Sequence, residues 1–362
     1  VEQLNKTALK AHGLDKSGHL YKVNSFDFHR YEDTIKLADD PDYNQAAFEG
    51  MLEIKGDSDH TKLIEMLDAL NDESQKIDDV LATYFDTENL VYWLAFQLLT
   101  GNCDTQNRNC YLYSPLNSNT WYFLDWDNDG MLRKLELSLT GFSDYASWER
   151  GVSNYWGNVL FNRALRSKSF RSELDAAVKD LRSYMTEERL AKMIKHYREV
   201  TESLVFAAPD IDNLPVTKDQ YEQIAAAIPA EIEENYKSFR ESYKKPMPFY
   251  IGMPQIDNGK LRINWDASYD FKARDIRYTV ELARDYAITD VIFKAEDVLL
   301  PEVTCDAPDT GQYFVRVRAT NSDGYTQDAF DYYVTDDGKQ YGMLCFYVQD
   351  GGKVVGDTYE EG

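Results

Sequence analysis

Hydrophobic positions recur at helical spacing through most of the first 245 residues. Residues 61–70 and 90–99 show this spacing, and Asp86 opens a helix start signal, Asp-Thr-Glu, before the second segment. Residues 90–99 are apolar on every face, so this predicted helix should be buried in a core. Four longer amphipathic segments predict further helices, at residues 158–166, 170–184, 187–207 and 218–243.

Short β-prone runs interrupt these helices. Residues 110–113 and 120–124 are rich in aromatic and apolar side chains, and the turn-forming sequence Ser-Pro-Leu-Asn-Ser-Asn lies between them. This arrangement predicts a hairpin. Residues 18–23 and 51–55 have the composition of two further short strands.

After residue 245 the pattern changes to an alternation of period two. Strands are predicted at residues 261–265, 277–282 and 311–319, with turn residues between them. The size and rhythm of this part are typical of a β-sandwich. It resembles a fibronectin type III domain, in which Trp265 would be the core tryptophan and Tyr313 the corner tyrosine. Such a domain is more often a spacer than a specific binding surface.

The two patterns together predict an α+β protein with two domains. A largely helical domain is expected at residues 1–246, because the Pro-Met-Pro sequence that starts at Pro246 resists helix and suits a linker. A β-sandwich is expected at residues 247–342, and a C-terminal strand or tail at residues 343–362.

Composition narrows the possible functions. The 362 residues include 63 acidic and 39 basic side chains, a formal charge of −24, which argues against nucleic-acid binding because phosphate affinity needs clustered cations. The content of 43% hydrophobic and 14% aromatic residues is that of a folded protein. The longest apolar run is far shorter than the roughly 18 residues that a membrane span needs, so no span is expected.

The four cysteines fall as one pair near the middle and one near the end. Cys103 and Cys110 form the first pair, and Cys305 and Cys345 the second. Each pair suits either a local disulfide, in an exported protein, or two buried thiols, and the spacing leaves both open.

Polar residues with a characteristic spacing follow the buried helix and the hairpin. Asp104 and Asn109 lie five residues apart in the turn before the hairpin, and Asp127 lies in an acidic loop after it. Phosphotransferases of the protein-kinase type use this order for a base, a metal-binding Asn and a metal-binding Asp. A hairpin would bring the two loops side by side, with oxygen ligands of the kind that Mg²⁺ prefers.

The sequence around these residues resembles that of the CotH, or spore coat protein H, family of atypical kinases. The shared motifs are Gly101-Asn102-x-Asp104, Asn109-x-Tyr111-Leu112-Tyr113 and Trp121-Tyr122-Phe123-Leu124-x-Trp126-Asp127-x-Asp129. The resemblance covers about the first 215 residues and implies the fold of a helical kinase C-lobe with a catalytic-loop hairpin.

The resemblance also implies roles for individual residues. Asp104 would be the catalytic residue, Asn109 and Asp127 would bind metal, and Asp129 matches a second acidic position. The implied cofactors are Mg²⁺ and ATP. The implied partner is a protein carrying Ser or Thr on a cell or spore surface, which places the chain outside the cell or on its surface.

Two departures from the family pattern affect this expectation. Asp125 stands where the family usually has proline. In longer relatives a nucleotide-binding lobe carries the lysine that holds ATP, and this lobe is expected upstream of residue 1. Lys22 and Lys55 could supply the positive charge of that lysine, but they resemble it in no other respect. We therefore expect the chain alone to bind ATP weakly or not at all, as a truncated kinase or a pseudokinase.

A rival hypothesis uses the same acidic loop. Asp125, Asp127, Asp129 and Glu136, with Gly130, satisfy the EF-hand spacing, so a structural Ca²⁺ site in a non-catalytic surface or adhesion module is the alternative. An EF-hand loop is entered from a helix, whereas this loop follows a predicted strand. Magnesium with nucleotide is therefore favoured, and a solvated acidic turn is the third possibility.

Overall fold

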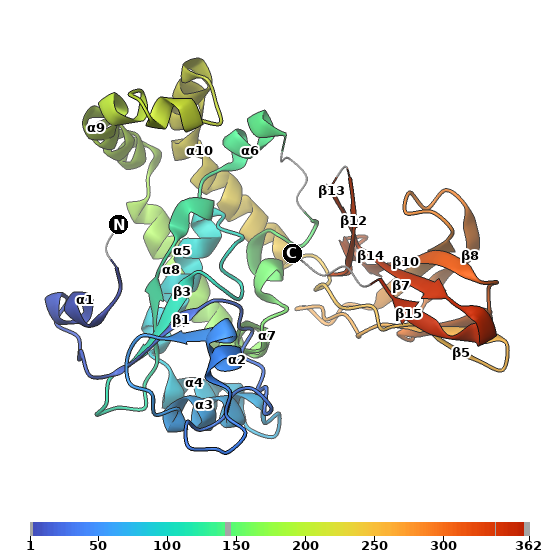
Figure 1. Ribbon diagram of the computed structural model, residues 1–362. Coiled ribbons are helices and arrows are strands. Elements are labelled where there is room, and N and C mark those ends of the chain that lie inside the picture. The colour runs from blue at the N-terminus through green and yellow to red at the C-terminus, as the bar shows by residue number, and fades with distance from the viewer. Residues whose placement is uncertain (1–2, 142–145, 337, 358–362) are drawn as a thin grey trace. The chain divides into compact units, whose positions relative to one another are not determined.

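The computed structural model describes residues 3–141, 146–336 and 338–357. It contains two compact units, an α+β unit and a unit of antiparallel sheets (Figure 1). Unit 1 comprises the described residues of 1–144 and 150–239, and unit 2 comprises those of 145–149 and 240–362. Helix α10, Lys218–Ser242, begins in unit 1 and ends in unit 2.

Helices form most of unit 1. Five of the expected helices are confirmed within two residues at each end: those at 61–70, 158–166, 170–184, 187–207 and 218–243. The α-helices are α1 Lys6–Ala11, α2 Gln45–Met51, α3 Thr61–Asn71, α4 Ile77–Tyr84, α5 Thr87–Thr100, α6 Lys134–Thr140, α7 Val159–Arg166, α8 Lys168–Tyr184, α9 Glu187–Val205 and α10 Lys218–Ser242. Three short 3₁₀ helices are η1 Asn128–Gly130, η2 Gly151–Tyr155 and η3 Asp210–Asn213.

Helix α5 lies in the core of unit 1, as its apolar sequence predicts. Asp86 caps its first turn by accepting a hydrogen bond from the backbone N–H of Asn89 at 2.9 Å. The helix ends at Gly101, whose φ of 66° is left-handed. A Cβ atom at Gly101 would lie 2.6 Å from Asn235 Nδ2, so the close approach of α10 also requires glycine there. These two ends fix where the following loop begins.

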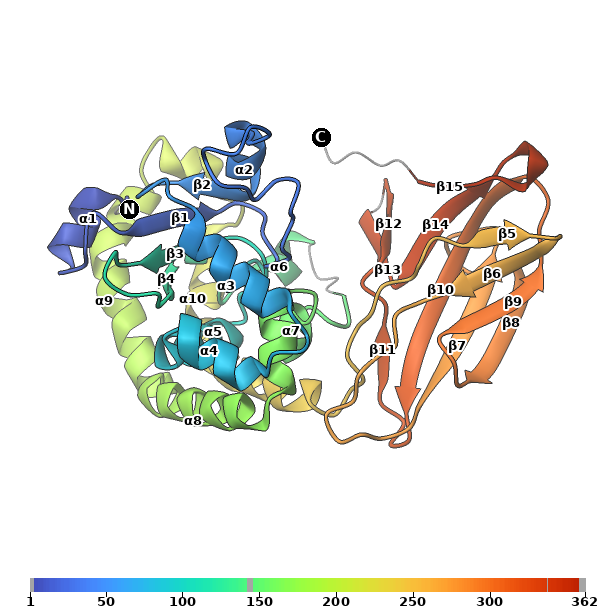
Figure 2. The ribbon, with the colours of Figure 1, turned by 90° about the horizontal axis from the view of Figure 1, so that it is seen from below.

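A four-stranded antiparallel sheet packs beside α5, in the order β2-β1-β3-β4. Its strands are β1 His19–Val23, β2 Leu52–Ile54, β3 Cys110–Ser114 and β4 Tyr122–Asp125. Tyr111 of β3 pairs with Leu124 of β4, which confirms the predicted hairpin. Figure 2 shows the sheet with α5 next to it, and α1 covers part of the other face through buried Leu9.

Unit 2 consists of antiparallel sheets. The larger has the order β15-β14-β10-β7-β8, with β11 paired to β10; the others are β5-β6-β9 and β12-β13. The strands are β5 Gln255–Asp257, β6 Lys260–Asn264, β7 Ile276–Ala283, β8 Val291–Val298, β9 Glu302–Asp306, β10 Gly311–Asn321, β11 Thr326–Asp328, β12 Tyr332–Thr335, β13 Gly338–Tyr341, β14 Met343–Val348 and β15 Val354–Gly356. A 3₁₀ helix, η4 Asp350–Gly352, lies between β14 and β15.

The core of unit 2 is shared by its two larger sheets. Leu261 of β6 and Val280, Val317 and Phe346 of the larger sheet belong to one buried cluster. Trp265 also belongs to it and lies 5.2 Å from Tyr278, measured between ring centroids. The alternating residues on which the strand predictions rested therefore face a common interior.

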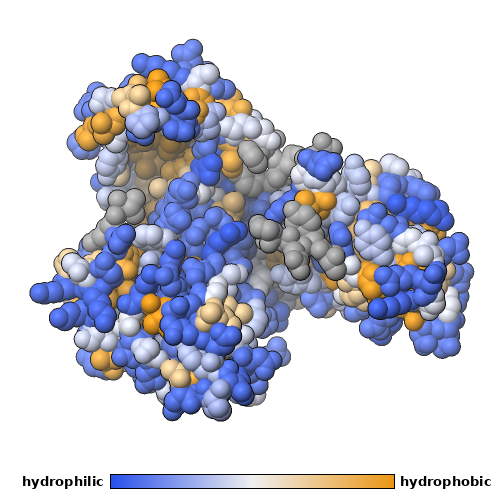
Figure 3. All heavy atoms as spheres, in the orientation of Figure 1, coloured by the Kyte–Doolittle hydropathy of each residue, from blue (hydrophilic) through white to orange (hydrophobic). Residues whose placement is uncertain are grey.

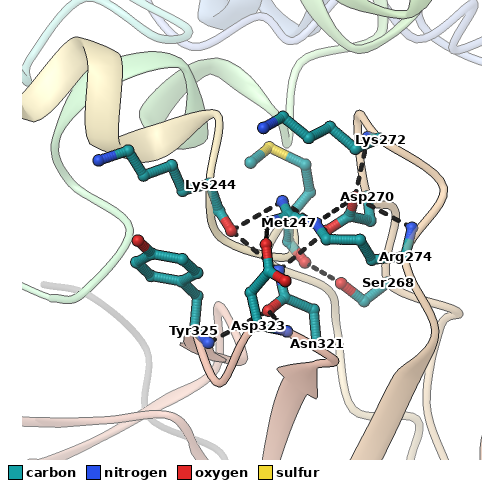
Figure 4. A network of polar contacts seen from close by, with 9 residues as sticks. All are labelled: Lys244, Met247, Ser268, Asp270, Lys272, Arg274, Asn321, Asp323 and Tyr325. Carbon is teal, nitrogen blue, oxygen red and sulfur yellow. Dashed lines mark hydrogen bonds and ion pairs between the residues drawn. The ribbon is translucent and has the colours of Figure 1, made fainter.

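A buried polar network joins the chain after α10 to loops of unit 2 (Figure 4). Arg274, whose side chain is 10% exposed, pairs with Asp270, which is 1% exposed, and with Asp323. Arg274 also donates to the carbonyl of Lys244, as does Asn321 Nδ2 at 2.8 Å. Because each buried charge has a partner, this network holds the loops without leaving an uncompensated charge.

A short segment around Ser147 is part of unit 2 although it lies far upstream in the sequence. Trp148 packs edge-on against Phe330 and Tyr341, at ring-centroid distances of 5.0 and 6.1 Å. Gln327 Nε2 donates to Ser147 Oγ at 2.8 Å. Sequence composition assigned this segment to the helical domain, and its long-range contacts explain the difference.

Helix α9 carries an exposed apolar face. Met193, Tyr197, Val200 and Leu204 are exposed on α9 at spacings of three and four residues, which places them on one side of the helix. Figure 3 shows hydrophobic residues gathered around this helix. Among the described residues, no helix is both long enough and apolar enough to cross a membrane.

Candidate functional site

Asp104 lies in the loop between α5 and β3 and contacts two other residues of that loop. Asn109 Nδ2 donates to Asp104 Oδ2 at 2.8 Å and to the Asp104 carbonyl at 3.1 Å. Arg108 Nε lies 2.9 Å from Asp104 Oδ1. Both carboxylate oxygens of Asp104 therefore have partners, and the two sequence-predicted residues Asp104 and Asn109 are in direct contact.

The acidic loop after β4 lies against this first loop. A Cβ atom at Gly130 would lie 2.6 Å from Asn102 Oδ1 and 3.4 Å from Asp104 Cβ, so any larger residue there would displace Asn102 or the loop. The backbone N–H of Leu132 donates to the Thr100 carbonyl at 2.8 Å. The structure thus brings the acidic loop beside Asp104, as the predicted hairpin required.

The acidic residues of this second loop differ in their surroundings. Asp127 adopts a left-handed φ of 56°, and it and Asp129 are exposed. Asp125 instead accepts a hydrogen bond from Gln97 Nε2 at 2.9 Å. Desolvation by the surrounding protein raises the pKa of Asp125, and the hydrogen bond from Gln97 opposes this shift. All three aspartates are exposed, and Asp125 is anchored to α5 through Gln97.

Gln97 connects the two loops, a role that the sequence analysis missed. It is 1% exposed within the apolar helix α5, and its Oε1 accepts a hydrogen bond from Asn102 Nδ2 at 3.0 Å. Its Nε2 reaches Asp125 and, at 3.5 Å, Asn128 Oδ1. A polar residue inside an otherwise apolar run was the available signal, because a buried amide needs hydrogen-bond partners.

The backbone of the Asp104 loop is held by side chains from the segment around η2. Four of its carbonyl oxygens accept hydrogen bonds from such side chains. The contacts are Arg150 Nη1 to Gly101 at 3.1 Å, Tyr155 Oη to Asn102 at 3.2 Å, Asn154 Nδ2 to Cys103 at 3.3 Å and Asn158 Nδ2 to Gln106 at 2.8 Å. The loop is therefore positioned by residues about 50 positions away, which sequence spacing gave no means to identify.

The donor set suits Mg²⁺ with a nucleotide better than a calcium cage. Asn109 uses its amide nitrogen for Asp104, which leaves its amide oxygen for a cation, and Asp127 offers an exposed carboxylate. Protein-bound Mg²⁺ commonly takes one or two such ligands and completes its shell with phosphates and water. Glu136, needed for the EF-hand set, forms a bidentate pair with Arg133 at 2.9 Å for both bonds.

A preformed cluster of three or more metal-binding side chains is absent from the described residues. Across residues 3–141, 146–336 and 338–357, no three His, Cys, Asp or Glu side chains are arranged to hold a metal ion. The four EF-hand positions, from Asp125 to Glu136, are thus not gathered into a cage. All four cysteines are free thiols, so no disulfide links Cys103 to Cys110.

A sheet face next to the acidic loop carries a cation and aromatic rings. Lys22 Nζ lies 6.0 Å from the centroid of the Trp126 ring, and Tyr111 meets the same ring edge-on at 5.4 Å. Lys55 instead pairs with Glu53 at 2.5 Å. Of the two lysines considered from sequence, only Lys22 is thus placed beside the acidic loop.

Comparison with known proteins identifies the family. Residues 1–239 match the family described as CotH kinase protein, which is most of the chain, so the protein belongs to this family. The match extends past the roughly 215 residues of the resemblance seen in the sequence. No curated protein matches the chain.

A solved structure shows a distant similarity. It is described as the twitchin kinase region from C. elegans (Fn31-NL-kin-CRD-Ig26), with 17% identity and a TM-score of 0.20. The similarity covers 26% of this chain and 20% of that chain, so the present chain spans a fifth of the solved one. A TM-score this low does not establish a shared fold.

Proposed function

We propose that unit 1 transfers the γ-phosphoryl group of ATP to a Ser or Thr hydroxyl of a protein. The observation that carries this proposal is the contact of Asp104 with Asn109, in a loop that packs beside the exposed carboxylates Asp127 and Asp129. Family membership supports the same reaction class. The family resemblance is the sole basis for placing the acceptor outside the cell.

In this proposal each residue has a defined task. Asp104 accepts the proton of the acceptor hydroxyl, whose oxygen forms a bond to the γ-phosphorus while the bond to the bridging oxygen of ADP breaks. Asn109 holds the Asp104 carboxylate through Nδ2 and offers its amide oxygen to Mg²⁺, together with Asp127. Asp129 provides a second carboxylate. When bound, Mg²⁺ neutralises phosphate charge.

The surrounding residues keep this arrangement in place. The Gln97 amide links Asn102 of the first loop to Asp125 of the second. The side chains around η2 fix the backbone of the first loop. Because positioning is a large part of catalysis in phosphoryl transfer, such contacts matter as much as the acidic residues themselves.

For unit 2 we propose a fibronectin type III domain that acts as a spacer. Tyr313 Oη donates to the Asp309 carbonyl at 2.9 Å, near the start of β10, which supports a tyrosine corner of the kind found in such sandwiches. The buried Trp265 and the common core of the two larger sheets support the same assignment.

The test is calorimetric titration with Mg-ATP of the full-length parent protein, including any segment that precedes residue 1. We expect binding by the wild type, a loss of at least about tenfold in Asp127→Ala, and no change in Asp306→Ala, an exposed aspartate of unit 2. Absence of binding by the wild type would contradict the proposal. Calcium binding without nucleotide that is lost in Glu136→Ala would instead establish the structural calcium module.

A further inference from the structure

Arg108 has an unusual position in the candidate site. It is the only Lys or Arg in the sequence from Gly101 to Leu132, a stretch that contains four aspartates. Those four are Asp104, Asp125, Asp127 and Asp129. An incoming triphosphate would therefore meet several negative charges and, from this stretch of chain, a single positive one.

In the structure Arg108 is paired with the proposed base. Its Nε lies 2.9 Å from Asp104 Oδ1, and the two side chains are 54% and 42% exposed. Asn109 Nδ2 occupies the other carboxylate oxygen. With one contact on each carboxylate oxygen, a substrate hydroxyl that approaches Oδ1 has to share that oxygen with Arg108.

The pair with Asp104 is weak enough to be exchanged. An exposed ion pair of this kind contributes little to stability, because water screens the two charges. A guanidinium can bind a phosphoryl group through two parallel hydrogen bonds, which is stronger and more directional than a single contact to an exposed carboxylate. Once a phosphoryl group lies within reach, the balance of energies therefore favours Arg108 on the phosphate.

We infer, resting on the proposed function, that Arg108 leaves Asp104 to bind the γ-phosphoryl group of the nucleotide. This exchange frees Asp104 Oδ1 from Arg108 as the nucleotide arrives, so the position beside Oδ1 opens to the substrate hydroxyl when a phosphoryl donor is present. During transfer the hydroxyl proton moves to Asp104, the new oxygen–phosphorus bond forms and ADP departs. Arg108 stabilises the charge on the transferring group, the task of an arginine supplied in cis.

The test compares ATP with ADP, because only ATP has a γ-phosphoryl group. Affinities of both nucleotides for wild type and Arg108→Gln are measured by calorimetry in the presence of Mg²⁺, with the full-length parent protein used in the previous test. We expect Arg108→Gln to weaken ATP binding about tenfold or more and to change ADP binding less than about twofold. The matched control is Arg262→Gln, an arginine that is 58% exposed and paired with Glu302 in unit 2, and it should change neither affinity.

A second variant separates phosphate recognition from simple support of Asp104. Arg108→Lys keeps the charge but loses the planar fork, so it should recover part of the ATP affinity that Arg108→Gln loses. Equal losses for ATP and ADP, or no loss for either, would overturn the inference while the proposed function stood. Absence of ATP binding by the wild type would instead remove the proposed function itself.

Discussion

Replacement of Gln97 by leucine tests whether the buried amide holds the two loops together. Gln97→Leu keeps a similar volume in the core of unit 1, so it creates little cavity. It removes the hydrogen bond to Asp125 Oδ1 at 2.9 Å and the one accepted from Asn102 Nδ2 at 3.0 Å. The perturbation is therefore a loss of polar partners rather than a loss of packing.

The expected cost follows from what the change leaves behind. Asn102 is 2% exposed, and a buried donor without a partner costs about 1–3 kcal/mol. The longer contact from Asn102 Nδ2 to Asn128 Oδ1, at 3.4 Å, offsets part of this loss. Asp125 is exposed enough for water to replace the amide. We expect Gln97→Leu to destabilise unit 1 by about 1–2 kcal/mol.

Differential scanning calorimetry of the whole chain measures this effect. For a unit of this size, each kcal/mol lowers the transition temperature by about 2–4 °C. The matched control is Gln327→Leu, since Gln327 is also 1% exposed but lies in unit 2 and donates to Ser147. Gln97→Leu should move the unit 1 transition and Gln327→Leu the unit 2 transition. If Gln97→Leu changes the free energy of unfolding of unit 1 by less than about 0.3 kcal/mol, the buried amide does not hold the two loops together.

Three further predictions concern unit 2. Arg274→Met leaves Asp270 buried without its cation and should destabilise unit 2 by about 3–5 kcal/mol in urea denaturation. Burial raises the pKa of Asp270, but hydrogen bonds, above all the one from Arg274, outweigh burial and lower the pKa overall. The stability contributed by the Arg274–Asp270 pair should therefore be lost as pH falls below the usual Asp range. Burial raises the pKa of Asp331 to about 6, so the folded state binds the carboxyl proton more tightly than the unfolded state does. The stability that this proton contributes is lost as pH rises through 6. Asp331→Asn should therefore flatten the dependence of unit 2 stability on pH between about pH 4 and 7, measured by calorimetry. Tyr313→Phe should cost about 0.5–1.5 kcal/mol in the same urea assay, and an unchanged midpoint would remove the structural role of its bond to Asp309.

Local signals in the sequence predicted the elements that carry the candidate site. The ten-residue apolar run and Asp86 were enough to place α5, because burial and capping are encoded by neighbouring residues. Two β-prone runs with a turn between them gave the hairpin. Since the order of these elements fixes which loops are neighbours, the sequence also predicted that Asp127 and Asp104 lie on adjacent loops.

Contacts between distant segments were beyond the reach of the sequence pattern. The bond of Asn158 to the Gln106 carbonyl joins residues 52 positions apart, and no periodicity marks either one. Trp148 belongs to unit 2 because it packs against Phe330, whereas its sequence neighbours suggested the helical domain. The periodicity of hydrophobic residues shows which face of a helix or strand is buried, but it does not show which other segment of the chain covers that face.

The proposed role of Asp104 as the base for phosphoryl transfer is best tested by comparing the wild type with Asp104→Asn. Transfer from γ-labelled ATP to protein serine or threonine is measured in a single turnover, for wild type and Asp104→Asn, at nucleotide concentrations that saturate both. Asp104→Asn should still bind Mg-ATP and should transfer the phosphoryl group about 10²–10⁴-fold more slowly than the wild type. Transfer at the wild-type rate by the saturated Asp104→Asn variant would contradict it.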